Sequence, residues 1–168
     1  DAVGEAFDKV ARMLKLPYPG GPEISALADK FQVLGRSTSK SLRLPRPMID
    51  SGDFDFRLAN FLGVSLVNLN VTQQQSVLAV LYTLKKIPKI TGAIKEEVAY
   101  EFQEAVTEIL ISKTLGAAEK YNIKTIAIGG GVSANKNIRA KLKEIIENKL
   151  PNTRFFIPPL EFTGDNAT

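Results

Sequence analysis

The stretch 123-IKTIAIGGGVSANKNIR-139 decides the fold of this chain. Its first six residues, Ile123 to Ile128, are rich in β-branched side chains, which predicts a short strand buried on both faces. Three consecutive glycines, Gly129 to Gly131, come next. Apolar residues then recur at three- and four-residue steps, the spacing of one helix face, at Ile138, Leu142, Ile145, Ile146 and Leu150. The sequence therefore predicts a strand, a glycine turn and a helix in that order.

A glycine turn between a strand and a helix favours anions, phosphate above all. Unpaired backbone N–H groups and the positive end of the helix dipole meet at such a turn. Ser133 and Asn135 are both credible N-cap residues for the helix that follows. The turn is not a Walker loop, since no Gly-Lys-Ser/Thr follows, and GGGVSAN lacks the spacing of the dinucleotide fingerprint. An ordinary strand–helix connection, whose glycines only allow close packing, remains the alternative interpretation.

The composition is that of a globular domain with few groups for catalysis. The chain has 168 residues, of which 44% are hydrophobic and 24% charged, enough for one domain with a sizeable core. It has no histidine and no cysteine, which excludes disulfides, thiolate chemistry, imidazole ligands and Ser-His-type triads. The net charge of +4 and the pI near 9.3 permit a nucleic-acid partner without requiring one.

The sequence gives no sign of a membrane partner. No stretch approaches the ~18 apolar residues of a membrane span, and no signal peptide opens the chain. We therefore expect a cytoplasmic protein. The chain begins at Asp1 directly in a helical pattern, so we also expect it to be a piece of a longer protein.

Apolar periodicity predicts further helices before the glycine turn. The first covers about Ala2 to Leu16, and a second short helix begins at Pro22 and includes Phe31. The longest runs from beyond Gly92 to about Lys120, with a broad apolar stripe and charges on the opposite face. A second strand is expected at Arg154–Ile157. These elements predict an α/β layout with a helical insertion before the central strand.

Two polar segments are candidates for binding. The loop from residue 35 to 53 carries four basic side chains before its first acid, namely Arg36, Lys40, Arg43 and Arg46. They could lie along a phosphate backbone, or the loop could simply be solvated. Asp165, in a Gly-Asp-Asn turn, lies beyond the last expected strand, at the edge where α/β proteins bind ligands. It is a candidate for holding a metal or orienting phosphate, although such a sequence is frequently only a turn.

Several stretches resemble one family, the tRNA adenosine threonylcarbamoyltransferases, formerly catalogued as O-sialoglycoprotein endopeptidases or glycoproteases. They are DAVGEAFDKVARMLKLPYPGGPEI (1–24), LPRPM (44–48), EFQEAV (101–106), IAIGGGVSANKNIR (126–139) and PPLEFTGDNA (158–167). The first of them resembles the bacterial branch of the family. The matched stretches cover most of the chain, and they correspond to the second half of the family sequence only.

The resemblance implies a fold of the actin-like, sugar-kinase and heat-shock ATPase group, in which two related lobes hold nucleotide in a cleft. Residues 1–168 would be the C-terminal lobe, a single unit of a longer two-lobe enzyme. The family transfers a threonylcarbamoyl group from threonylcarbamoyl-AMP to the exocyclic amine of an adenosine beside the tRNA anticodon, which implies ATP or threonylcarbamoyl-AMP as the ligand. The implied partners are tRNA, the missing N-terminal lobe, a paralogous scaffold protein and an ATPase.

The resemblance also implies roles for six residues. Asp8 would accept hydrogen bonds from ribose hydroxyls, and the backbone of Gly21 would close on the nucleotide. Gly130 and Gly131 would flank the phosphates, Asn135 would contact the ligand, and Asp165 would bind a divalent metal, with iron expected. The other metal ligands of the family are two histidines in the missing half. We therefore expect the isolated chain to bind metal poorly and to be inactive, and no catalytic base is identified.

The segment Arg57–Val80 departs from the family pattern. The family normally has Ser-Phe-Ser-Gly-Leu-Lys-Thr after DFDF, a motif expected near the substrate RNA, and this chain has a longer, unrelated segment there. An alternative function is therefore a non-catalytic interaction or scaffold module of the same modification complex. A small-molecule kinase of the same fold group is a third interpretation, but such kinases lack the FDK, PGGP and GDN motifs.

Overall fold

The computed structural model describes residues 2–44, 46, 49, 80, 83–85 and 87–163. Its helices are α1 (Ala2–Met13), α2 (Gly20–Val33), α5 (Gly92–Lys120) and α6 (Lys136–Lys149). The strands β1 (Thr125–Ala127) and β2 (Arg154–Phe156) and the 3₁₀ helices η1 (Gly131–Ala134) and η2 (Leu160–Phe162) complete the described elements. The predicted α/β layout is confirmed as a mostly helical chain with a small parallel sheet. Residues 57–79, most of the atypical segment, and Asp165 lie outside the described residues.

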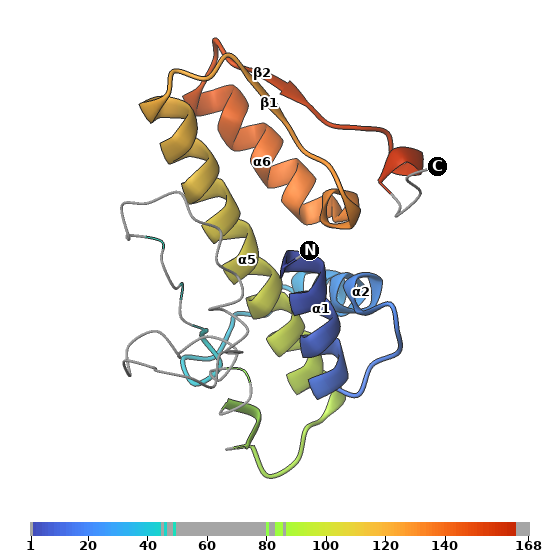
Figure 1. Cartoon of the computed structure of the whole chain (residues 1–168). Helices are drawn as coiled ribbons and strands as arrows, with labels where there is room; N and C mark the ends of the chain where they lie inside the picture. Colours follow the sequence, from blue (N-terminus) through green and yellow to red (C-terminus); the bar gives the residue numbers. More distant parts are fainter. Residues whose placement is uncertain are drawn as a thin grey trace, which may run out of the picture.

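The long helix α5 is the axis around which the other elements pack. Helices α1 and α2 lie against its N-terminal half, and α6 lies along its C-terminal half, with the strands beside α6 (Figure 1). The hydroxyl of Thr91 caps the start of α5, where it accepts a hydrogen bond from the N–H of Ile94 at 3.4 Å. Because α5 has neighbours on several sides, the polar side chains of Glu101 and Gln103 are buried as well. The sequence predicted an apolar stripe on this helix with charges on the opposite face, and two of those charged residues, Glu101 and Lys113, are buried.

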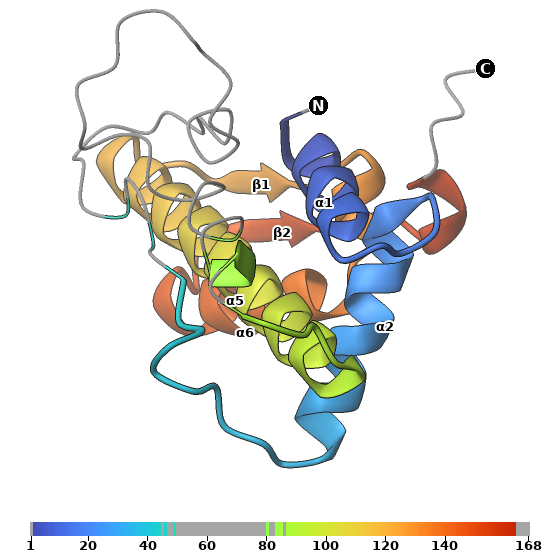
Figure 2. The same ribbon diagram turned by 90° about the horizontal axis from the view of Figure 1, so that it is seen from below.

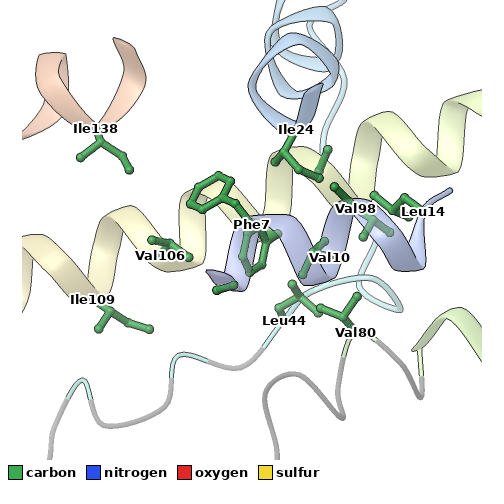
Figure 3. Packing of buried hydrophobic residues seen from close by; sticks show 14 of the residues in the cluster. Phe7, Val10, Leu14, Ile24, Leu44, Val80, Val98, Val106, Ile109 and Ile138 are labelled. Carbon is green, nitrogen blue, oxygen red and sulfur yellow. The ribbon is translucent and has the colours of Figure 1, made fainter. Parts of the chain in front are cut away.

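The hydrophobic core lies where α1, α2 and α5 meet. The rings of Phe7 and Phe102 pack edge to face with their centroids 5.0 Å apart. Figure 3 shows Val10 of α1, Ile24 of α2 and Val98 of α5 converging on the same region. Full burial of side chains of this size contributes about 1.5–3 kcal/mol each. The apolar face predicted for the first helix is thereby confirmed.

Helix α1 ends three residues earlier than predicted. Lys15 adopts the left-handed conformation with φ 54°, which breaks the helix. The N–H of Leu16 donates to the carbonyl of Ala11 at 2.9 Å, and the N–H of Lys15 donates to that of Arg12 at 3.0 Å. This pair of bonds is the Schellman arrangement, which satisfies the free carbonyls of a helix end.

Helix α2 begins two residues before the predicted start. It includes Gly20 and Gly21, so that Pro22 is its third residue and not its first. A proline is tolerated there, because N–H groups in the first turn of a helix have no acceptor inside the helix.

The sheet has two parallel strands within the described residues, with Thr125 paired to Arg154 and Ala127 to Phe156. The prediction of a strand buried on both faces is wrong. Ile126 packs against the core, whereas Thr125 and Ala127 on the opposite face are exposed. Successive side chains of a strand point to opposite faces, and no described element covers this second face. Both strands point toward the end of the molecule where α1 and α2 lie (Figure 2).

The basic loop after α2 is attached to α5 by acidic side chains. Arg36 pairs with Glu96 at 2.9 Å, and Arg46 pairs with Glu101 and with Glu108. Neither arginine is therefore simply solvated or free to lie along a phosphate backbone. Burial alone lowers the pKa of Arg46, but hydrogen bonds to Glu108 and Glu101 outweigh it and raise this pKa above its usual value. The Arg46 guanidinium stays charged.

None of the described helices is both long and apolar enough to cross a membrane.

Candidate functional site

A cavity of about 810 Å³ opens between the α1–α2 pair and the glycine turn. Volumes of this size are typical of small-molecule sites. One face of α2, the first turn of α6 and one side of α1 line it, together with η1, η2 and Gln103 of α5. Of the residues predicted for the site, the structure brings four to this cavity, namely Asp8, Gly21, Gly131 and Asn135.

Asp8 connects α1 to the start of α2. Its Oδ1 accepts a hydrogen bond from the N–H of Gly20 at 2.7 Å. A carboxylate at this position is favoured, because the first amides of a helix are unpaired and its N-terminus is positive. The side chain is half-buried and lines the cavity. Within the described part of the chain no partner is shown for its second oxygen, Oδ2, so this atom can accept a ligand hydroxyl.

The two glycines of the PGG motif have different requirements. A Cβ atom on Gly20 would lie 2.6 Å from Cβ of Ala11 and 2.8 Å from Cα of Asp8, so only glycine lets α1 and α2 approach here. A Cβ atom on Gly21 would have no atom within 4 Å and would enter open space at the cavity. The sequence-based prediction included Gly21 and not Gly20, because the approach of Gly20 to Ala11 becomes visible only in the structure.

The glycine turn has its special backbone conformation at Gly130. This residue has φ 73° and ψ 174°, a region that other residues rarely adopt. Its carbonyl accepts hydrogen bonds from Ser133, from the N–H at 2.9 Å and from the hydroxyl at 2.7 Å. Gly131 follows with a Cβ position that is open, and it lines the cavity. Ser133 is buried in this turn and is not the N-cap of α6.

Asn135 is the N-cap of α6 and part of a buried polar network. Its Oδ1 accepts a hydrogen bond from the N–H of Ile138 at 3.0 Å. Its Nδ2 donates to Oε1 of Gln103 at 2.7 Å and to Oγ of Ser25 at 2.8 Å. Ser25 in turn donates to the same Gln103 oxygen at 3.0 Å. Both amide hydrogens of Asn135 are thus donated within the chain, and a ligand that accepts one of them has to displace Ser25 or Gln103.

Gln103 and Ser25 belong to the cavity lining but were not among the predicted site residues. Gln103 is only 1% exposed, and its oxygen joins three elements that are far apart in sequence. Burying an amide is unfavourable unless it is hydrogen-bonded, and the network provides those bonds. The sequence held no clear signal for Gln103, because Glu101 and Glu104 lie beside it and a polar residue there does not stand out.

Arg139 joins the two segments that follow the strands. One guanidinium nitrogen donates to the carbonyl of Ser133 at 2.8 Å, and another donates to that of Pro158 at 2.6 Å. Ser133 belongs to the turn after β1, and Pro158 belongs to the segment between β2 and η2. Arg139 therefore connects both walls at the carboxyl ends of the strands, where α/β proteins bind ligands.

The charged side chains that line the cavity are Asp8, Asp29 and Lys136. In the part of the chain that the structure describes, no three His, Cys, Asp or Glu residues are arranged to hold a metal ion. These residues therefore do not by themselves fit a metal, and the predicted ligand Asp165 lies outside them.

A family model described as tRNA N6-adenosine threonylcarbamoyltransferase matches residues 1–168. Curated proteins of that name are similar to this chain over 167 residues, or 99% of its length. The protein of Thermosipho melanesiensis is 45% identical, that of Kosmotoga olearia 41% and that of Shouchella clausii 36%. The chain spans only 42–43% of the length of these relatives.

Proposed function

The chain belongs to the tRNA N6-adenosine threonylcarbamoyltransferase family, and from this membership we propose that it is the nucleotide-binding part of such an enzyme. The complete protein would transfer a threonylcarbamoyl group from threonylcarbamoyl-AMP to an adenosine next to the tRNA anticodon. The observation that carries this proposal is that residues distant in sequence line one cavity, with Asp8 and Gly21 on one side and Gly131 and Asn135 on the other.

The geometry of the cavity supports binding of an adenylate. Oδ2 of Asp8 can accept a hydrogen bond from a ribose hydroxyl, and the open Cβ position of Gly21 leaves room for the ligand against the backbone. A phosphate would lie near the turn at Gly130 and Gly131 and the N-terminus of α6, because the first amides of a helix are unpaired and this end of its dipole is positive. Asn135 would fix the position of the N-terminus of α6 by capping this helix and by its hydrogen bond to Gln103.

In the transfer step the exocyclic amine of adenosine attacks the carbamoyl carbon. A carbon–nitrogen bond forms, the bond from that carbon to the phosphate oxygen breaks, and AMP leaves while the amine loses a proton. We assign no general base in this chain. Its residues would accelerate the step by holding the adenylate and by stabilising the charge on the leaving phosphate.

The architecture and partners of the complete protein follow as further parts of the proposal. We place residues 1–168 as the C-terminal lobe of a two-lobe actin-like fold, because the relatives are about twice as long. The N-terminal lobe, the tRNA, a paralogous scaffold protein and an ATPase would be its partners in the cytoplasm. Asp165 would bind a divalent metal, with iron expected, together with histidines of the missing lobe, and we derive no step through that metal. The isolated chain, which has no histidine or cysteine, is expected to show no tight metal binding by calorimetry.

The test uses the complete protein that contains this chain. Asn135→Ala is compared with Asn152→Ala, which changes an exposed asparagine in the turn before β2. We expect the first variant to lose most incorporation of labelled threonine into tRNA and to bind ATP more weakly in calorimetry. The second should match the unaltered protein in both assays. Full tRNA modification by Asn135→Ala would contradict the proposal.

A non-catalytic scaffold module gives a different pattern in the same experiment. In that case the complete protein would bind its partner proteins but would neither bind ATP nor modify tRNA, and Asn135→Ala would change nothing.

A further inference from the structure

Arg139 connects the two segments that follow the strands, and the proposed function gives this connection no part in ligand binding. It lies in the first turn of α6, is half-buried and is not among the residues that line the cavity. Both hydrogen bonds described for its side chain go to backbone carbonyls, those of Ser133 and Pro158. An arginine that binds backbone on two different segments fixes the position of each segment relative to the other.

The two segments need such a link, because the sheet ends before it reaches the cavity. The last hydrogen bond between the strands runs from the N–H of Ile128 to the carbonyl of Phe156 at 3.2 Å. Beyond this hydrogen bond, the segment after β1 continues to the glycine turn, and the segment after β2 continues to η2. The cavity is lined on the first side by Gly131 and Val132 and on the second by Leu160 and Thr163. The Arg139 side chain links the two segments beyond the last hydrogen bond between β1 and β2.

Within the described residues, the guanidinium also carries a charge that is paired with no carboxylate. None of the ion pairs formed within the described ranges includes Arg139, and its two acceptors are neutral carbonyls. Arg139 can therefore affect an anionic ligand in two ways. It can fix the position of the segments that line the cavity, or it can attract the ligand through its positive charge. The planar fork of arginine reaches two acceptors at once, whereas lysine keeps the charge on a single flexible ammonium. The two effects can therefore be separated by substitution.

We propose that Arg139 is a positioning residue that sets the distance between the glycine turn and residues 158–163, and through it the affinity for the adenylate. The proposal rests on the proposed function and deepens it. The positioning effect is expected to outweigh the effect of charge, because both hydrogen bonds of the guanidinium go to the backbone of the two segments and neither is directed at the cavity. Arg139 therefore acts on the ligand through Gly131, Val132 and the η2 residues.

The experiment measures tRNA modification by the complete protein with Arg139→Lys, Arg139→Met and the control Lys143→Met. Lys143 lies one turn further along α6, and its exposed ammonium is 3.9 Å from Glu147. We expect both Arg139 variants to raise the KM for threonylcarbamoyl-AMP by about ten-fold, the equivalent of one weakened interaction. The KM for tRNA should stay unchanged in both Arg139 variants. The Lys143→Met control should keep the original KM for both substrates. A merely structural role would lower the amount of active protein without changing either KM.

Two outcomes would overturn the proposal. In the first, Arg139→Lys keeps the original KM while Arg139→Met raises it, which means that charge alone matters. In the second, both variants keep the original KM, and only the amount of active protein falls. Calorimetry with ATP separates these from failure of the proposed function. If the unaltered complete protein binds no ATP and modifies no tRNA, the function itself is wrong. If it does both and the variants match it, only the role of Arg139 is wrong.

Discussion

Asn135 and Gln103 are joined by a 2.7 Å hydrogen bond between the Nδ2 of the first and the Oε1 of the second. The bond connects the N-cap of α6 to the middle of α5, across 32 positions of sequence. Ser25 of α2 binds to both residues, so one buried oxygen holds three helices around the cavity. The orientation of the glycine turn therefore depends on residues that are not part of it.

Replacement of Gln103 by leucine should damage this arrangement. The change removes the acceptor of Asn135 and Ser25, and an unpaired buried donor costs about 1–3 kcal/mol. We expect the free energy of unfolding to fall by about 2 kcal/mol and ATP binding to weaken. Urea denaturation and calorimetry of the complete protein measure the two effects.

Thr107→Val is the matched control for that change. Thr107 lies on the same helix, is fully buried, and donates its hydroxyl to the backbone carbonyl of Gln103 at 2.7 Å, but it does not line the cavity. It should lose about 1 kcal/mol of stability and keep its ATP affinity. Equal loss of affinity in both variants would mean that the network has no special role at the site.

Alanine substitutions at the PGG motif should separate packing from binding. Gly20→Ala places a methyl group 2.6 Å from Cβ of Ala11, so the helices must move apart, at a cost of about 1–3 kcal/mol. Gly21→Ala adds a methyl group in open space and should change stability by no more than about 0.5 kcal/mol. We expect Gly21→Ala to fold normally in thermal unfolding and to bind ATP more weakly. Unchanged ATP binding would remove Gly21 from the site.

The glycine turn offers a second pair of substitutions. Gly130→Ala forces a side chain onto a backbone with φ 73° and should cost about 1–3 kcal/mol. Gly131→Ala has neither a positive φ nor a steric conflict and should keep its stability. Urea denaturation of the two variants tests the difference. If they are equally stable, the conformation of Gly130 is not a requirement.

Arg46→Leu should be strongly destabilising, because it leaves Glu101 without its charged partner. The Glu101 side chain is only 5% exposed, and loss of one member of a buried pair costs about 3 kcal/mol. A double variant with Glu101→Gln removes the unpaired charge and keeps an acceptor for the N–H of Leu44, which binds Glu101 at 3.0 Å. We expect the double variant to recover at least part of the loss in urea denaturation. A double variant that is no more stable than Arg46→Leu would show that the charge of Glu101 is not the cause.

Regular apolar spacing predicted the helices of this chain well, and backbone effects explain the differences. The helix over residues 92–120 was placed correctly because its pattern extends over many turns. The end of α1 was misplaced, because the apolar face continues through Leu14 and Leu16 while the left-handed Lys15 ends the helix. The burial of β1 was overestimated, because apolarity shows that a strand can be covered but does not show which elements cover it.

The site residues also divide into some that the sequence predicted and others that it did not. Asp8, Gly21 and Asn135 came from motifs that resemble the family, and the structure places all three at one cavity. Gln103 and Arg139 were missed, because their roles depend on contacts between segments distant in sequence. The roles predicted for all of the site residues, Asp165 included, and for the segment 57–80 stay predictions.

None of the elements that the structure describes covers the Thr125 face of the sheet, and this has a consequence for handling the protein in solution. Phe156 is 57% exposed, and Thr125 and Ala127 are exposed beside it. Parallel sheets are usually covered on both faces, and exposed strand edges are templates for pairing with another chain. At high protein concentration the isolated 168-residue chain should therefore self-associate through this sheet, and a charged residue at Phe156 should keep it monodisperse.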